Sequence, residues 1–124
     1  ELALSAGEPC AKGLVELFTE NGVFQPGGSK PLVGRAAIRA YYAARPKNWV
    51  TRHVSTNVRL TYIDRDHVEA VRVFTHYIGD RTDGPGPYPA IPSVGEYREV
   101  VERGADGRWR YASRIATALF SRGR

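Results

Sequence analysis

Residues 50–78 alternate more strictly than any other part of this 124-residue chain, and they constrain its fold most. Two runs rich in β-branched and aromatic residues flank the turn formed by Asp64, Arg65 and Asp66. In each run every second side chain points to the same side of an extended backbone. The pattern predicts a long β-hairpin with one face toward a core or cavity and the other toward solvent.

This hairpin places two histidines on one predicted face. The first arm carries His53 and Asn57 at even spacing, and the second carries Phe74 and His76 in the same way. An imidazole has a pKa near neutrality, so it can take up a proton and return it at pH 7. We interpret His53 and His76 as candidate catalytic residues; the alternative is a pair of core or surface histidines.

Before the hairpin, the apolar spacing predicts a helix over residues 9–18, which the Asn-Gly pair at residues 21–22 ends. A short strand is expected at residues 23–25, because a Pro-Gly-Gly turn follows it. A second helix is expected to begin after Gly34 and to end before Pro46, since the residue before a proline disfavours the helical conformation.

After the hairpin, residues 94–103 and 108–120 alternate as two strands joined by a turn at residues 105–107. The long Gly/Pro-rich loop at residues 79–92 is typical of a lid, and we expect its Tyr88 to close over a ligand. The order of the elements predicts an α+β fold, with helices on one face of a curved antiparallel sheet. The length predicts a single domain, residues 1–124.

The composition argues against several classes of partner. The net charge is +5, from 18 Lys and Arg against 13 Asp and Glu, but acidic residues interleave with scattered arginines, so we expect no nucleic-acid partner. No apolar run reaches the roughly 20 residues of a membrane span. The single cysteine, Cys10, forms no internal disulfide and the first residues show no signal-peptide pattern, so we expect a cytoplasmic protein.

Four segments in order carry a resemblance that spans nearly the whole chain. They are LFTENGVF at residues 17–24, GRAAIR at 34–39, RHVSTN at 52–57 and GRWR at 107–110. Together they resemble the nuclear transport factor 2-like superfamily, and within it the SnoaL-like and scytalone dehydratase-like branch. The resemblance implies a cone-shaped, curved antiparallel sheet with N-terminal helices over its concave face, a cystatin-like roll.

The resemblance also implies roles for the two histidines. In scytalone dehydratase a strand histidine at the position of His53 is the general acid/base, and a second histidine near the position of His76 supports it. The Tyr-Asp pair of that enzyme's first helix has no match here, since only the displaced Glu8 is ionisable in that region. Gln25 stands where ketosteroid isomerases on this fold carry their aspartate base, and an amide cannot remove a proton.

A further set of residues is expected to bind the substrate. Tyr97 is expected to donate its hydroxyl to a developing oxyanion. Tyr41 and Tyr42 point about 100° apart on a helix, so at most one of them is expected to face the pocket. The full predicted substrate-binding set is Phe24, Tyr41, Trp49, Asn57, Phe74, Tyr88 and Tyr97. We expect no metal, because no third ligand accompanies the two histidines.

These observations predict a small cofactor-independent lyase, isomerase or cyclase. Its substrate would be an apolar, oxygenated molecule of polyketide-, steroid- or aromatic-like character. The alternative is a non-catalytic small-molecule-binding or dimerisation module on the same fold. Because members of the family commonly pair through the exposed sheet face, we also expect a homodimer. That face would be formed by Val54, Thr56, Val58, Val71 and Val73.

Overall fold

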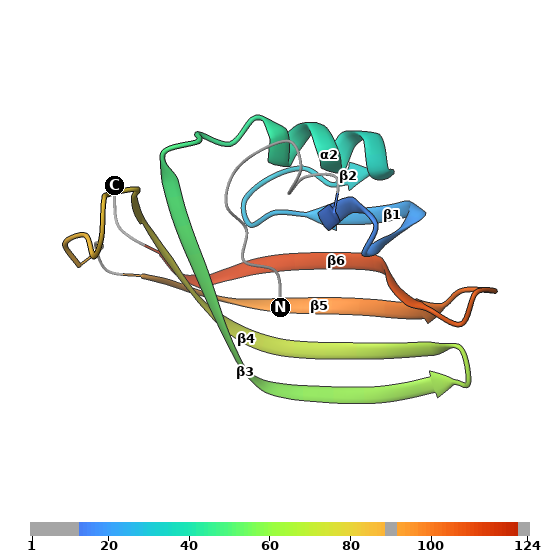
Figure 1. The fold of residues 1–124 in the computed structure, drawn as a ribbon. Helices are drawn as coiled ribbons and strands as arrows, with labels where there is room; N and C mark the ends of the chain where they lie inside the picture. Colours follow the sequence, from blue (N-terminus) through green and yellow to red (C-terminus); the bar gives the residue numbers. More distant parts are fainter. Residues whose placement is uncertain (1–12, 89–91, 122–124) are drawn as a thin grey trace.

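A computed structural model describes residues 13–88 and 92–121 of the chain. Six strands form one curved sheet whose hydrogen-bonded order is β2-β1-β6-β5-β4-β3 (Figure 1). The elements, in chain order, are β1 (Phe18–Gln25), β2 (Leu32–Val33), α2 (Arg35–Ala43), β3 (Trp49–Asp64), β4 (His67–Asp80), β5 (Ser93–Arg103) and β6 (Trp109–Phe120). This arrangement confirms the predicted α+β class. The sheet differs in one detail from the antiparallel prediction, because β1 runs parallel to β6.

The predicted hairpin is confirmed as β3 and β4, joined by a turn at Arg65 and Asp66. The register places His53 directly opposite His76. A β-bulge interrupts β3 at Asn57, whose φ of 53° lies in the left-handed region that asparagine tolerates better than most residues. The register jumps from Thr56 to Arg59 at this point, so the faces of β3 exchange beyond the bulge.

The predicted helix over residues 9–18 is wrong at its C-terminal end. Residues 1–12 lie outside the described structure; within it, residues 13–15 are helical and β1 already begins at Phe18. Phe18 pairs with Tyr111 of β6, and the register then shifts before Val23. Gly22 lies in this irregular part of β1, where an added Cβ would be 3.0 Å from the Phe18 Cβ. The Asn-Gly pair therefore shapes a distortion within a strand and does not terminate the helix.

Helix α2 covers β1 and β2 at one end of the sheet (Figure 1). Its Ile38 is fully buried and packs with Phe18 and Phe24 in one hydrophobic cluster. The guanidinium of Arg35 fixes the start of the helix, because it donates hydrogen bonds of 3.0 and 2.7 Å to the Phe18 carbonyl. These contacts hold α2 away from β4 and β5 and leave room between the helix and the concave face of the sheet. None of the helical segments in the described ranges has the length and apolar character needed to span a membrane.

Candidate active site

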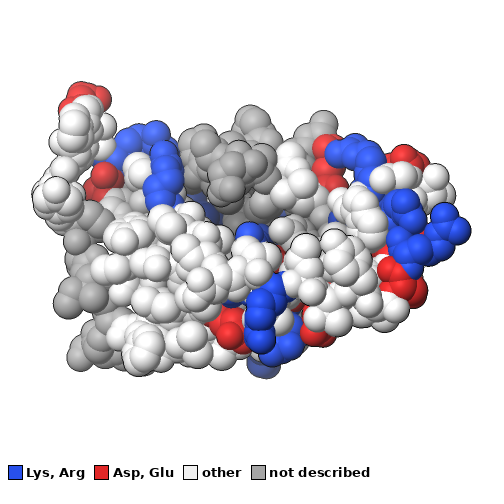
Figure 2. Space-filling model, turned by 90° about the horizontal axis from the view of Figure 1, so that it is seen from below, with Lys and Arg blue, Asp and Glu red and all other residues white. Residues whose placement is uncertain are grey.

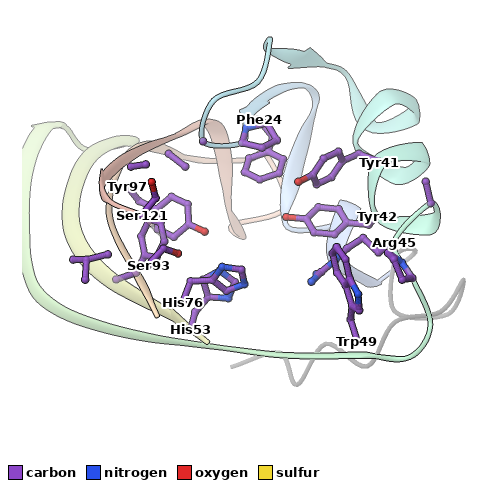
Figure 3. A pocket seen from close by; sticks show the side chains of 18 residues that line it. Phe24, Tyr41, Tyr42, Arg45, Trp49, His53, His76, Ser93, Tyr97 and Ser121 are labelled. Carbon is purple, nitrogen blue, oxygen red and sulfur yellow. The ribbon is translucent and has the colours of Figure 1, made fainter. Parts of the chain in front are cut away.

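A cavity of about 640 Å³ lies between α2 and the concave face of the sheet (Figure 3). Its volume is that of a site for a drug-sized molecule. Side chains from α2, β1, β3, β4, β5 and β6 line it, and most of the predicted site residues are among them. Those that line it are Phe24, Tyr41, Trp49, His53, Phe74, His76 and Tyr97.

The two histidines form a stacked pair on the cavity wall. Their ring centroids are 4.4 Å apart and the ring planes differ by 15°. The pair lies against the aromatic wall, with the His53 centroid 5.6 Å from that of Phe74 and 6.4 Å from that of Tyr97. The expectation that both imidazoles face one pocket is therefore met by the geometry.

His53 is held in its neutral form. Burial of the imidazole is the largest cause that lowers its pKa from 6.5 to about 4, and the neighbouring His76 is the next. Three positive charges act in the same direction, those of Arg114, Arg45 and Arg72. The residue also keeps enough exposed surface, and lines the cavity, so that its ring is within reach of a ligand. At pH 7 the group can thus accept a proton, and it becomes a donor only after it has accepted one.

Tyr97 supplies a hydroxyl that points into the same cavity (Figure 3). The side chain is buried, and its ring stacks on Phe74 with a centroid separation of 4.2 Å. Burial raises the pKa of Tyr97, and the charges of Arg114 and Arg72 oppose this rise. The hydroxyl is therefore protonated at pH 7 and can donate a hydrogen bond to an oxyanion.

A buried ion cluster lies on the concave face behind Tyr97. The Glu99 side chain is 3% exposed, and its Oε2 lies 3.1 Å from Arg72 Nη2 and 3.0 Å from Arg114 Nε. The Arg114 guanidinium carbon is also 3.9 Å from the centroid of the Tyr97 ring. The carboxylate is engaged by two cations, so it supports the site and is not available as a base.

Tyr41 and Tyr42 both line the cavity, which corrects the expectation that at most one would. Phe24, which also lines the cavity, holds both tyrosine rings there. Its ring packs edge-on against Tyr41 and stacks on Tyr42, with centroids 5.8 and 5.7 Å away. The cavity wraps around the end of α2, so two adjacent helical directions both border it. Burial raises the pKa of Tyr42, which is consequently a protonated hydroxyl as well.

Two predicted substrate-binding residues lie elsewhere. Asn57 lines a separate hollow with Val71, Val73 and Glu96, because the bulge turns it away from the His53 face. Tyr88 is fully exposed at 101% and does not line the cavity. In the described part of the loop, residues 81–88, Thr82, Gly84, Gly86 and Pro87 border a separate hollow with residues 77–80 of β4 and with Val50 and Arg52 of β3. That the loop closes over a ligand stays a prediction.

Three polar residues of the cavity were missed by the sequence reasoning: Arg45, Ser93 and Ser121. Arg45 follows α2 and is half-buried, and its Nη2 donates a 3.2 Å hydrogen bond to Thr51 Oγ1. Arg45 stands directly before Pro46, and the residue before a proline disfavours the helical conformation. The sequence therefore places Arg45 at the end of the helix that borders the predicted pocket, which could have identified it. In the described part of the chain, no three His, Cys, Asp or Glu side chains gather in an arrangement that could hold a metal ion.

Comparison with solved structures shows where else this arrangement of elements occurs. A protein from Catenulispora acidiphila, solved in complex with S-DNPA, is 27% identical; the match covers 90% of this chain and 80% of that chain with a TM-score of 0.68. ActVI-ORFA from Streptomyces coelicolor is 22% identical, with 88% and 82% of the two chains covered and a TM-score of 0.75. An NTF2-like protein with a cystatin-like fold from Novosphingobium aromaticivorans is 22% identical, with 90% and 71% covered and a TM-score of 0.67.

These similarities confirm the predicted nuclear transport factor 2-like, cystatin-like fold. Among curated proteins, none matches this chain. The sequence profile of one family, described as the SnoaL-like domain, matches residues 5–115, which is most of the chain. The chain therefore belongs to the SnoaL-like domain family.

Proposed function

We propose that this protein is a cofactor-independent lyase, isomerase or cyclase that works by proton transfer on an apolar, oxygenated small molecule. One observation carries the proposal: the stacked His53–His76 pair and the Tyr97 hydroxyl share one aromatic-walled cavity. A base, a residue that supports it and a hydrogen-bond donor for an oxyanion are the groups that proton abstraction next to a carbonyl needs.

In the proposed reaction, neutral His53 takes a proton from the carbon next to a substrate carbonyl. The electron pair of the broken C–H bond forms an enolate, whose oxygen accepts a hydrogen bond from the Tyr97 hydroxyl. Return of the proton to another carbon completes an isomerisation. Departure of a β-hydroxyl, protonated by the His53 imidazolium and released as water, completes a dehydration. Attack of the enolate carbon on a second carbonyl closes a ring, and the His53 imidazolium then protonates the alkoxide that forms. His76 stacks on His53 and orients it.

The relative from Catenulispora acidiphila supports a small-molecule ligand for this cavity, since it was solved in complex with S-DNPA. Fold alone does not select among the three reaction types, because unrelated functions share this architecture. The proposal therefore concerns the proton-transfer step that the three types have in common.

The test is exchange of the α-protons of 2-tetralone, an apolar bicyclic ketone, for deuterium in D₂O, followed by proton NMR. We expect the protein to accelerate exchange over buffer, and His53→Gln to lower the acceleration by at least about 100-fold. His67→Gln is the matched control, because His67 is the first residue of β4, hydrogen-bonds Asp64 and does not line the cavity. Equal exchange rates in the His53→Gln variant and the wild type would overturn the proposal.

A second candidate is a non-catalytic small-molecule-binding module. It is favoured by the lack of a match to the Tyr-Asp pair of the dehydratase's first helix, where this sequence has only the displaced Glu8. The module predicts that the wild type binds 2-tetralone, seen as a change in its fluorescence, without any acceleration of exchange.

A further inference from the structure

The charged side chains that line the cavity are of one sign. Among residues 13–88 and 92–121, the side chains that line it include one with a permanent charge, Arg45, and neither an aspartate nor a glutamate. The other polar side chains among these lining residues include two histidines, three tyrosines and two serines, and burial keeps His53 neutral at pH 7. An apolar cavity of this kind would suit a neutral ligand, except that a cation has been placed in its wall.

The position of Arg45 is not explained by an ion pair. Its hydrogen bond goes to the neutral hydroxyl of Thr51, which is 5% exposed. No carboxylate in residues 13–88 or 92–121 lies within the 4.0 Å limit of an ion pair with it. Arg72 and Arg114 differ in this respect, because Glu99 neutralises part of their charge. A half-buried cation that no carboxylate of these described residues neutralises is a ready site for an anionic group of a ligand.

The surrounding charges act in the same direction. Arg72, Arg114 and Glu99 do not line the cavity, but together they carry one net positive charge directly behind Tyr97, which does. Arg45 adds a second from the opposite wall, where it reaches in beside Trp49 (Figure 3). The field inside the cavity is therefore positive, and a low-dielectric wall strengthens it.

We propose that the ligand of this cavity is an aromatic-ring organic acid whose anionic oxygen pairs with Arg45. Its ring system would lie along the aromatic wall of Phe24, Tyr42 and Phe74, with its reacting end at His53, His76 and Tyr97. This inference rests on the proposed function for the location of the reacting end, and it names the substrate class. Arg45 is then the residue that orients the substrate.

Ligand charge would also act on the base. Arg45 is among the cations that lower the pKa of His53, so an anion paired with it would raise that pKa toward its ordinary value. His53 would become a stronger base when the acid is bound, which links recognition at Arg45 to proton transfer.

The test compares 2-naphthoate with 2-naphthamide, a neutral analogue of nearly the same shape. Dissociation constants are measured at pH 7.5 from the change in intrinsic fluorescence, since Trp49 lines the cavity. We expect the wild type to bind the acid at least about tenfold more tightly than the amide. Arg45→Met should weaken acid binding about tenfold or more and leave amide binding within about twofold.

Lys47→Met is the matched control, because Lys47 is an exposed cation two residues away that does not line the cavity. It should leave the preference for the acid intact. Arg45→Lys keeps the charge and should retain most of the preference, which preserves the test should Arg45→Met not fold. Equal binding of acid and amide by the wild type, binding of neither, or a preference that survives Arg45→Met would each overturn the inference.

Neither probe has an α-proton to exchange, so this result is independent of the 2-tetralone assay. Acid preference without exchange would leave an acid-binding module and overturn the proposed catalysis. Exchange without acid preference would leave the catalysis standing and overturn the assignment of the substrate class.

Discussion

At the scale of single residues, the ion cluster of Arg72, Glu99 and Arg114 behind Tyr97 depends on Glu99. This nearly buried carboxylate lies between the guanidiniums of Arg72 and Arg114, and Arg114 in turn packs on the ring of Tyr97. Removing one charge from such a cluster costs more than the cluster contributes, because the remaining charges stay buried without compensation.

We therefore expect Glu99→Gln to lower the free energy of unfolding by about 3–5 kcal/mol, measured by urea denaturation. Glu96→Gln is the control, because Glu96 is a more exposed carboxylate three positions earlier on β5 and pairs weakly with Arg98 at 3.9 Å. It should change stability by at most about 0.5 kcal/mol. Similar decreases in the free energy of unfolding for both variants would show that Glu99 does not stabilise the ion cluster behind Tyr97.

At the scale of the elements, the antiparallel pairing of β4 with β5 sets the shape of the cavity wall. Phe74 on β4 is paired with Gly95 on β5. A Cβ added at Gly95 would clash with Phe74 Cζ, and it would lie 2.7 Å from Phe74 Cε1 and 2.9 Å from the Thr117 carbonyl oxygen. The absent side chain is what allows the Phe74 ring to lie flat against Tyr97.

Gly95→Ala is expected to destabilise the protein by about 1–3 kcal/mol, since it overpacks a buried contact and displaces the Phe74 ring. Urea denaturation measures the loss, and weaker 2-tetralone binding should accompany it. Gly27→Ala is the comparison within the same cavity lining, because its Cβ would meet only the Ala118 nitrogen at 3.9 Å. An equal effect at both positions would contradict the packing argument.

The elements also show how far the sequence could predict this molecule. Alternation predicted β3, β4, β5 and β6 and the shared face of His53 and His76. That face is kept because β3 has two irregularities between His53 and the turn, and the second reverses the exchange of faces made by the first. It misplaced Asn57, since a bulge breaks the alternation and nothing in the local pattern announces it. It missed the start of β1, where pairing of Phe18 with Tyr111 from a distant strand overrides helical spacing. Arg45 was missed although it stands directly before Pro46, because that local signal marks the end of a helix and does not show that the side chain lines the cavity.

At the scale of the whole molecule, β3 leaves a long edge of the sheet uncovered. Among the strands of the described residues it pairs with β4 alone, and its side chains are exposed from Arg52 to Asp64. Viewed from below in Figure 2, uncharged side chains cover much of the surface, with charged ones at its centre and its ends. Val54 and Val58 are 50% and 56% exposed, whereas Val71 of the predicted dimer face is already buried.

The predicted homodimer remains a prediction, and β3 is where we expect the contact. Static light scattering should give twice the monomer mass, and Val54→Lys should shift the protein toward monomer because it places a charge in an apolar contact. Val33→Lys is the control, since Val33 is 66% exposed on β2 at the opposite edge of the sheet. A monomeric wild type, or an equal shift in both variants, would contradict this assignment.

The central claim is that a neutral His53, held in the cavity, is the base. The pH dependence of 2-tetralone exchange tests it most directly, because a rate measured at low ketone concentration reports the pKa of the essential group in the free protein. The native pKa of His53 lies below 6.5, so an unfolded chain takes up the proton first and stability falls as the pH drops from 6.5 toward 4. Circular dichroism at each pH therefore accompanies the rates.

We predict an exchange rate that is constant from pH 7 to about pH 5 and falls to half near pH 4, the pKa of His53. The His53→Gln variant should lose both the rate and this acid limb. A half-point near 6.5 while the protein remains folded, or the same profile in the variant, would contradict the claim that the neutral His53 of this cavity removes the proton.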